Sequence, residues 1–307
     1  MDINRRDFIR TSAVVTGGSL LGQLTITNKG RKCIPGKLIR ITEVDSNFER
    51  EPLIRPFGFK GGYMKEIWQT AALIKSESGI HKIGICSQSI LWSDAQLFSS
   101  HSESGGNALM YAMTEHGLSL LRNRSFTDPV SLLDEIWPVV YDYGKKICAR
   151  NDLRPTFALN SLVGVDNALW LLYAAENNIT DFDDLVPEPY KPALSHHHER
   201  IASIPLMAYS IPVSEIKSAV DQGYFFLKIK IGQPGTQSEM LEKDIARLTE
   251  IHRAIGSATT NYSNSGKLPY YFDANGRYES KETLMRFLDH AKKIGAFDQI
   301  AIIEEPF

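Results

Sequence analysis

Hydrophobic and polar residues follow two different patterns along this chain, and the change falls near residue 200. In the first part, apolar residues alternate with polar ones at a period of two, which predicts half-buried strands. Apolar residues at helical spacing follow, one run opening at Asp128 and another covering about 162–178. A sheet followed by helices is typical of a compact α+β domain. The predicted strands are 38–44, 67–74 and 81–86, the last two joined by a turn at 77–79.

Two segments rich in glycine, proline or serine interrupt this pattern, at residues 51–62 and 87–107. Such composition is typical of turns and loops. The sequence therefore predicts two flexible loops here.

Strands and helices alternate from residue 204 to the last residue, 307. The predicted strands are 204–210, 224–231, 270–273 and 300–304, and each helix between them has an apolar stripe. Such alternation indicates a parallel sheet, here the first half of a (β/α) barrel. The polar segment 256–269 connects a helix to the next strand. We therefore expect it at the face opposite a barrel site, without a catalytic role.

A segment rich in proline and polar residues, 183–203, separates the two patterns and carries His196, His197 and His198. Three histidines suggest a metal site. Successive side chains of an extended chain point to opposite faces, however, so these converge poorly on one ion. A solvated linker is the favoured interpretation. The predicted organisation is an α+β domain at 37–182, this linker at 183–203 and a partial barrel at 204–307.

The composition excludes only some classes of function. The chain has 307 residues, 43% of them hydrophobic, and a formal net charge of −2. The chain lacks the excess of basic residues that would indicate nucleic acid as a partner. The three cysteines, Cys33, Cys86 and Cys148, lack metal-type spacing. Cys86 and Cys148 could pair in an oxidising compartment, but free buried thiols are favoured.

The N-terminus, residues 1–36, resembles a twin-arginine export signal. Arg5 and Arg6 precede Phe8, Ile9 and Arg10, and a charge-free run covers 11–28. Its apolar part is shorter than the ~20 residues of a membrane span, so stable membrane insertion is not expected. The resemblance implies export of the folded protein to the periplasm. An ordinary basic amphipathic leader is the alternative.

Charged residues gather at the ends of the predicted barrel strands. Lys228 and Lys230 share one strand face by the period of two, and Asp273 and Glu304 end the following strands. These four side chains would point into one opening at the carboxyl ends of the strands. Burying them there without partners would cost several kcal/mol each. Structural ion pairs are one interpretation. The other is a site with Mg²⁺ between the carboxylates and a lysine of lowered pKa as base.

Three motifs in this order resemble the enolase superfamily, in its mandelate racemase and muconate lactonizing branch. They are Lys-Ile-Lys-Ile-Gly at 228–232, Phe-Asp-Ala-Asn-Gly at 272–276 and Ile-Glu-Glu-Pro at 303–306. Segments 165–170 and 204–205 add to a resemblance that spans 37–307. It implies an α+β capping domain over a (β/α)7β barrel. It also implies a Mg²⁺-dependent enzyme that removes the proton α to a carboxylate of a small substrate.

The resemblance also implies roles for single residues. Lys230 would be the acid/base and Lys228 its helper, while Asp273 and Glu304 would be metal ligands. Asn275 and Glu305 would support them, and the segments 51–62 and 87–107, with Arg55 and Lys60, would select the substrate. Racemase, epimerase, dehydratase and cycloisomerase activities all fit. A dipeptide epimerase is favoured, and a homo-oligomer is compatible with a full-length form.

The sequence departs from the family's pattern because it stops after the fourth barrel strand. A third metal ligand and a base on the opposite substrate face are absent, whereas a barrel typically has about 250 residues. We therefore expect an N-terminal fragment that does not turn over substrate alone. An inactive remnant or an exported, non-catalytic binding protein stays an alternative.

A doubly wound nucleotide-binding domain, with Asp273 at a ribose, is disfavoured. No Gly-x-Gly-x-x-Gly follows any predicted strand, and 232–235 is a poor substitute.

Overall fold

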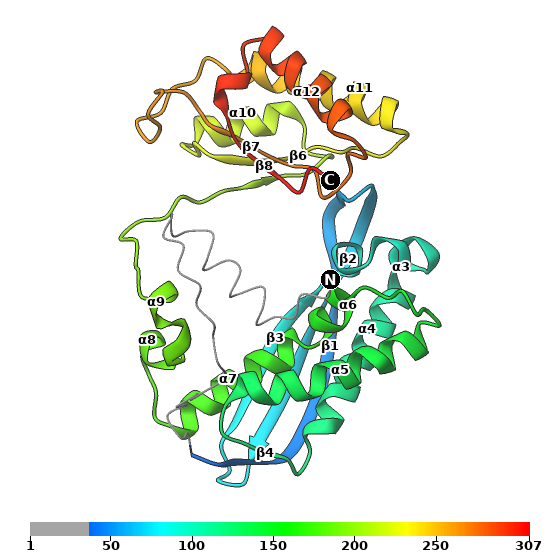
Figure 1. The fold of residues 1–307 in the computed structure, drawn as a ribbon, viewed down its shortest axis with the longest axis vertical. Coiled ribbons are helices and arrows are strands. Elements are labelled where there is room, and N and C mark those ends of the chain that lie inside the picture. Colours follow the sequence, from blue (N-terminus) through cyan, green and yellow to red (C-terminus); the bar gives the residue numbers. More distant parts are fainter. Residues whose placement is uncertain (1–36) are drawn as a thin grey trace, which may run out of the picture.

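The computed structural model describes residues 37–307, so the predicted export leader and Cys33 lie outside the described residues. Figure 1 shows two parts. One is an antiparallel sheet covered by helices, with strand order β3-β2-β1-β4, and the other is a parallel sheet with order β5-β6-β7-β8. This arrangement confirms the predicted fold class, an α+β cap followed by the first half of a barrel.

The cap is built on three long strands, which bury their apolar residues beneath helices. Its strands are β1 (Ile39–Phe59), β2 (Gly62–Ser76), β3 (His81–Gln88) and the short β4 (Ser125–Phe126). Its helices are α2 (Ile90–Ser93), α3 (Ala95–Ser100), α4 (Glu103–Leu121), α5 (Pro129–Ile147), α6 (Pro155–Ser161) and α7 (Val163–Glu176).

The predicted loop at 51–62 is wrong, because β1 and β2 continue through it as a hairpin. Lys60 and Gly61 form the turn with φ of 51° and 76°, a left-handed pair that suits a two-residue hairpin. The prolines are accommodated because the pairing register shifts between Pro52 and Phe57. Cross-strand pairing thus overrides a composition that indicated a loop.

The predicted loop at 87–107 is also wrong, since it contains α2, α3 and the start of α4. Its polar residues are helix caps. The Asp94 side chain accepts hydrogen bonds from Gln96 N and Leu97 N, and the Ser102 side chain accepts one from Gly105 N. Asp and Ser at these positions satisfy backbone donors that the first helical turn leaves free.

The helix predicted at about 162–178 is confirmed as α7, and the preceding α6, which was not predicted, meets it at an angle of 47°. Of the described helices, none is long and apolar enough alone to cross a membrane, and only this bent pair passes by length and composition. Cys86 and Cys148 are free and buried, which confirms the favoured interpretation of these two thiols.

The connection between the two parts carries short helices: α8 (Phe182–Leu185), η1 (Glu188–Tyr190) and α9 (Lys191–Leu194). His196, His197 and His198 follow and are all exposed. In Figure 1 this connection runs along the outside of the molecule, away from the end where the strands of the parallel sheet meet the cap.

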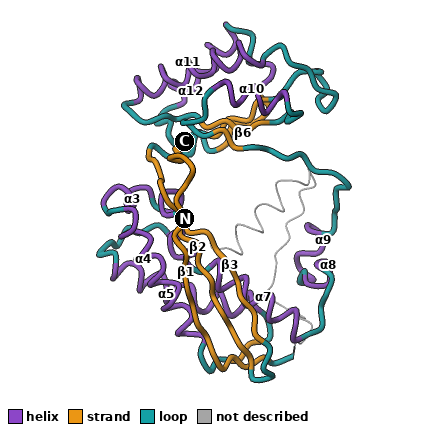
Figure 2. The backbone as a smooth tube through the Cα atoms, turned by 180° about the vertical axis from the view of Figure 1, so that it is seen from behind, coloured by secondary structure: helices purple, strands orange, loops and turns teal. Residues whose placement is uncertain are grey.

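The half-barrel alternates strands and helices as predicted, although its first strand is shorter than expected. Helices cover one face of the sheet (Figures 1 and 2). Leu227 and Ile229 point to that face and are 3% and 0% exposed. The elements are β5 (Leu206–Met207), α10 (Val213–Asp221), β6 (Leu227–Lys230), α11 (Gln237–Ile255), β7 (Tyr270–Asp273), α12 (Lys281–Lys293), η2 (Phe297–Gln299) and β8 (Ile300–Glu304).

The tip of the β1–β2 hairpin touches the half-barrel near its strand ends (Figure 2). Ser210 Oγ donates to Pro56 O at 2.9 Å, and Arg55 makes two hydrogen bonds of 2.7 Å to the Glu215 carboxylate. The segment predicted as a loop therefore brings the cap to the end of the sheet where the charged residues lie.

Candidate functional site

The strand register brings the predicted site residues to one level. Lys230, Asp273 and Glu304 are the last residues of β6, β7 and β8. Lys230 is paired with Asp273 in the sheet, and Asp273 with Glu304. In parallel α/β sheets, sites lie at the carboxyl ends of the strands.

The four charged side chains meet in one network. Lys228 Nζ lies 2.8 Å from Asp273 Oδ2 and 2.5 Å from Glu304 Oε2, so its ammonium group bridges the two carboxylates. Lys230 Nζ lies 2.6 Å from the same Asp273 oxygen and donates to Asn275 Oδ1 at 2.7 Å. The structure thus brings together all four residues that the sequence singles out.

Sharp turns after the strands hold this network. Gly232, Asn275 and Glu305 all have positive φ, at 79°, 48° and 40°. The turn at Asn275 lets its backbone N–H donate to Asp273 Oδ1 at 3.0 Å. Asp273 therefore has one oxygen fixed by the backbone and the other facing the lysines.

Tyr271 is a site residue that the sequence interpretation missed. Its hydroxyl donates to Glu304 Oε2, and Lys228 Nζ lies 5.0 Å from its ring centroid. The period of two could have found it, because Tyr271 shares a strand face with Asp273. Phe59, in the mispredicted hairpin, was also missed. Its ring centroid lies 5.6 Å from Lys230 Nζ.

A buried carboxylate behind the site was missed as well. Asp244, fully buried on α11, accepts hydrogen bonds from Gly232 N at 2.7 Å and Tyr278 Oη at 2.9 Å. It therefore links the turns that follow β6 and β7. A polar residue between Leu241 and Leu248 on an apolar helix face was the available signal.

The two lysines have opposite electrostatic environments. Burial lowers the pKa of Lys230 and outweighs the nearby Asp273 carboxylate, which raises it. For Lys228, burial also lowers the pKa, but hydrogen bonds to Asp273 and Glu304 raise it well above its usual value. Burial works to raise the pKa of Asp273, yet the two ammonium groups bring it below its usual range. Lys230 is thus the easier lysine to deprotonate, and Lys228 stays charged.

The two cap cations singled out from the sequence lie in different places. Arg55 is paired with Glu215 on an exposed surface. Lys60 sits in the hairpin turn and donates to Trp92 O at 2.9 Å.

Asp273 and Glu304 fit a divalent cation as two of its oxygen ligands. Their carboxylates already converge on one positive group, the Lys228 ammonium. Mg²⁺ suits such a pair, since it often takes one or two carboxylates and completes its shell with water or substrate. Within residues 37–307, no group of three or more His, Cys, Asp or Glu is placed to hold a metal.

Comparison by sequence finds nothing: no protein-family model and no curated protein matches the chain. Comparison by structure finds solved folds of similar arrangement. A dipeptide epimerase from Enterococcus faecalis, complexed with Mg and L-Leu-L-Tyr, aligns with 87% of this chain at a TM-score of 0.55 and 15% identity. The L-Ala-D/L-Glu epimerase from Bacillus subtilis aligns with 87% at 0.54 and 15%. An L-talarate/galactarate dehydratase from Salmonella typhimurium aligns with 92% at 0.55 and 18%.

The chain spans about 61% of the length of the two epimerases and 62% of that of the dehydratase. A mandelate racemase/muconate lactonizing enzyme-like protein from Rubrobacter xylanophilus is covered to a similar extent, 60%, at a TM-score of 0.52 and 17% identity. Over the cap and four strands of the barrel, the chain therefore has the fold of the mandelate racemase and muconate lactonizing branch of the enolase superfamily.

Proposed function

We propose that this chain carries the first half of the active site of a Mg²⁺-dependent enzyme, which removes the proton α to a carboxylate. The observation that carries the proposal is the bridged network of two lysines and two carboxylates at the carboxyl ends of β6, β7 and β8. Lys230 and Asp273 are buried, at 5% and 1% exposed. Buried charges are costly, so their position at the end of the sheet that meets the cap favours a site.

The two lysines would have different roles, one as the base and the other in orienting the substrate. Lys230, whose pKa burial lowers, accepts the α-proton on its neutral amine, and the electron pair of the C–H bond moves into the adjoining carboxylate group. Lys228 keeps its charge beside Asp273 and Glu304 and orients that carboxylate.

Asp273 and Glu304 would hold Mg²⁺. When bound, the ion supplies positive charge that stabilises the anion left by proton removal. Asn275 and Tyr271 would keep the neighbouring groups in place, through the contacts of Asn275 with Lys230 and of Tyr271 with Glu304.

Dipeptides are the substrate class we favour, with epimerisation as the reaction, because two of the similar structures are dipeptide-type epimerases. Dehydration of a sugar acid is the second candidate, which the similarity to the talarate dehydratase favours. We further propose that the segment around Arg5 and Arg6 directs the protein to the periplasm.

Hydrogen exchange tests the proposed reaction, because exchange needs one base whereas epimerisation needs a base on each face. The chain is incubated in D2O with MgCl2 and a panel of dipeptides, N-acyl amino acids and sugar acids. Loss of the α-proton signal is followed by NMR. We expect exchange with the parent chain and none with Lys230→Ala. Lys281→Ala, which removes an exposed lysine at the start of α12, serves as the control.

Retained exchange in Lys230→Ala would remove this lysine from the role of base. The absence of exchange with every acid in the panel would count against the reaction itself.

A further inference from the structure

A groove on the cap lies between the start of α5, the second half of α7 and the connection that carries α8, η1 and α9. Its cavity has a volume of about 100 Å³, below the roughly 300 Å³ at which small-molecule pockets usually begin. The wall is largely aromatic and apolar and includes Trp170, Tyr173, Val186, Pro187 and Tyr190. A cavity of this size and lining suits one or two side chains of a peptide rather than a cofactor.

The rim of the groove carries an excess of negative charge. Asp184 is exposed and makes no hydrogen bond or ion pair through its carboxylate with any of residues 37–307. Glu188 is also exposed and lies 2.6 Å from Lys191 Nζ, while Asp128 caps the start of α5. The groove thus has three carboxylates against one ammonium group.

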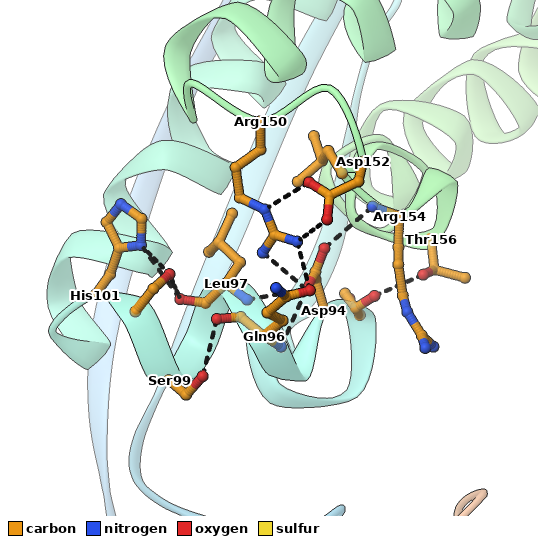
Figure 3. A network of polar contacts seen from close by, with 12 residues as sticks. Asp94, Gln96, Leu97, Ser99, His101, Arg150, Asp152, Arg154 and Thr156 are labelled. Carbon is orange, nitrogen blue, oxygen red and sulfur yellow. Dashed lines mark hydrogen bonds and ion pairs between the residues drawn. The ribbon is translucent and has the colours of Figure 1, made fainter.

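Buried acids elsewhere in the cap are used within the fold. Asp94 is 1% exposed, lies 3.5 Å from Arg150 Nη1 and accepts a hydrogen bond from Arg154 N at 3.1 Å (Figure 3). Glu176 is 6% exposed and lies 2.6 Å from Lys37 Nζ. The acids of the groove differ because they are exposed and their charge is open to a basic partner.

The chain comes into the cap next to this groove. The described part begins at Lys37, whose backbone N–H donates to Asn177 Oδ1 at 3.2 Å. Asn177 Nδ2 donates in turn to Tyr173 O at 2.8 Å. Trp170 is seven residues before Asn177, a rise of about 10 Å along a helix. The eight residues 29–36 span at most about 29 Å, so they can reach the groove from Lys37.

Residues 29–36 have a composition complementary to the groove. Their sequence is Lys-Gly-Arg-Lys-Cys-Ile-Pro-Gly, with three basic residues and one apolar pair. No Asp or Glu lies between Asp7 and Glu43, so these positive charges have no acid near them in the sequence. Aromatic-lined grooves are a common binding surface for segments that contain proline.

We propose that this groove binds residues 29–36 of the same chain. Ile34 and Pro35, within three residues of Lys37, pack in its aromatic part, and the basic residues lie along Asp184 and Glu188. Exposed ion pairs are individually weak, so binding depends on the apolar pair and on the high effective concentration of a covalently linked segment. The docked segment holds the junction between the predicted leader and the cap against the folded domain.

Disulfide trapping through Cys33 tests the docking in the full chain. Cys86 and Cys148 are buried, so Cys33 is the thiol we expect to react with a cysteine introduced at the surface. Purified Pro189→Cys, changed at an exposed residue of the groove, is oxidised with diamide. Mass spectrometry of the digested protein measures the disulfide between Cys33 and position 189. We expect it to form within single molecules.

Thr180→Cys is the matched control for the reach of the segment. Thr180 is exposed and three residues after Asn177, but it does not line the groove. Its disulfide with Cys33 should form about fivefold more slowly, because docking raises the effective concentration of Cys33 only at the groove.

Charge variants in the Pro189→Cys chain test the recognition. Asp184→Asn combined with Glu188→Gln should slow the trapping about fivefold, as expected for the loss of two exposed ion pairs. Asp184→Glu, which keeps the charge, should not slow it. Both positions are exposed, so the fold is not at risk.

Equal trapping at positions 180 and 189, no trapping at 189, or trapping that the double charge variant does not slow would overturn the proposal. A disulfide between Cys33 of one molecule and position 189 of another, seen as a covalent dimer, would assign the groove to a second copy and would overturn it too. Trapping needs neither Mg²⁺ nor substrate, so its outcome is independent of the proposed reaction.

Discussion

Single charged residues determine the chemistry at the carboxyl ends of these strands, and the pKa shifts of neighbouring lysines have opposite directions. Lys228 and Lys230 point to the same side of β6, yet burial dominates for Lys230 and two carboxylates dominate for Lys228. One strand thus presents a lysine that can become neutral next to one that stays charged.

Asp244 makes a pH-dependent contribution to stability. Burial raises the pKa of its carboxyl to about 6, above the usual value, although Gly232 N and Tyr278 Oη donate to it. As pH rises, the unfolded chain loses this proton first, near pH 4, and the folded chain only near pH 6. The stability due to protonated Asp244 is therefore present at low pH and is lost as pH rises through 6.

Comparison with Asp244→Asn checks this sign. Asparagine does not titrate, so the free energy of unfolding of the parent should fall relative to that of the variant by about 2 kcal/mol between pH 4.5 and 7.5. Urea unfolding at both pH values measures the difference. Parallel pH dependence of the two proteins would mean that Asp244 is ionised throughout.

At the scale of elements, the cap depends on close contact between β3 and α7. A Cβ added at Gly84 would lie 2.0 Å from Gly164 O and 2.4 Å from Ala168 N, both backbone atoms. Neither can move without shifting the helix. Glycine at 84 therefore sets the distance between the sheet and α7.

Gly84→Ala should consequently lower the free energy of unfolding by about 3 kcal/mol, through overpacking. Ile85→Ala is the control, because that side chain lies next to Gly84 but is 62% exposed. It should change stability by less than about 1 kcal/mol, as surface substitutions usually do. Denaturant midpoints compare the two variants. Equal losses of unfolding free energy in the two variants would show that α7 can move away from β3 with little loss of stability.

Helices and strands were predicted correctly from the sequence where the hydrophobic periodicity was strong. The predictions were wrong where tertiary contacts determined the local structure. The alternation around Lys228 and the stripe of α11 gave the half-barrel correctly. The segments 51–62 and 87–107 were mistaken for loops because proline, glycine and serine are typical of turns. In the structure the same residue types form a paired hairpin and a series of helix caps.

At the scale of the molecule, the cap meets the half-barrel at the carboxyl ends of its strands. Phe59 and Lys60 come from the hairpin and lie about 170 residues in sequence from Lys230. Strand periodicity places Lys228, Lys230, Asp273 and Glu304 together from the sequence alone. Strand periodicity does not indicate which cap residues lie beside these four, because that depends on how the cap packs against the half-barrel. The place of Phe59 beside Lys230 was accessible only from the fold.

We propose that the position between Asp273 and Glu304 binds a cation, and that the contacts of Lys228 with these carboxylates are not a purely structural ion pair. Calorimetric titration with Mg²⁺ tests it most directly. The parent chain should bind Mg²⁺ saturably, Asp273→Asn at least tenfold more weakly, and Lys228→Met more tightly because the competing ammonium group is gone. Asp298→Asn, an exposed acid in η2 at the opposite end of β8, should match the parent. If neither the parent nor Lys228→Met binds Mg²⁺, or if Asp273→Asn binds it as the parent does, the four residues form a structural salt-bridge network and not a metal site.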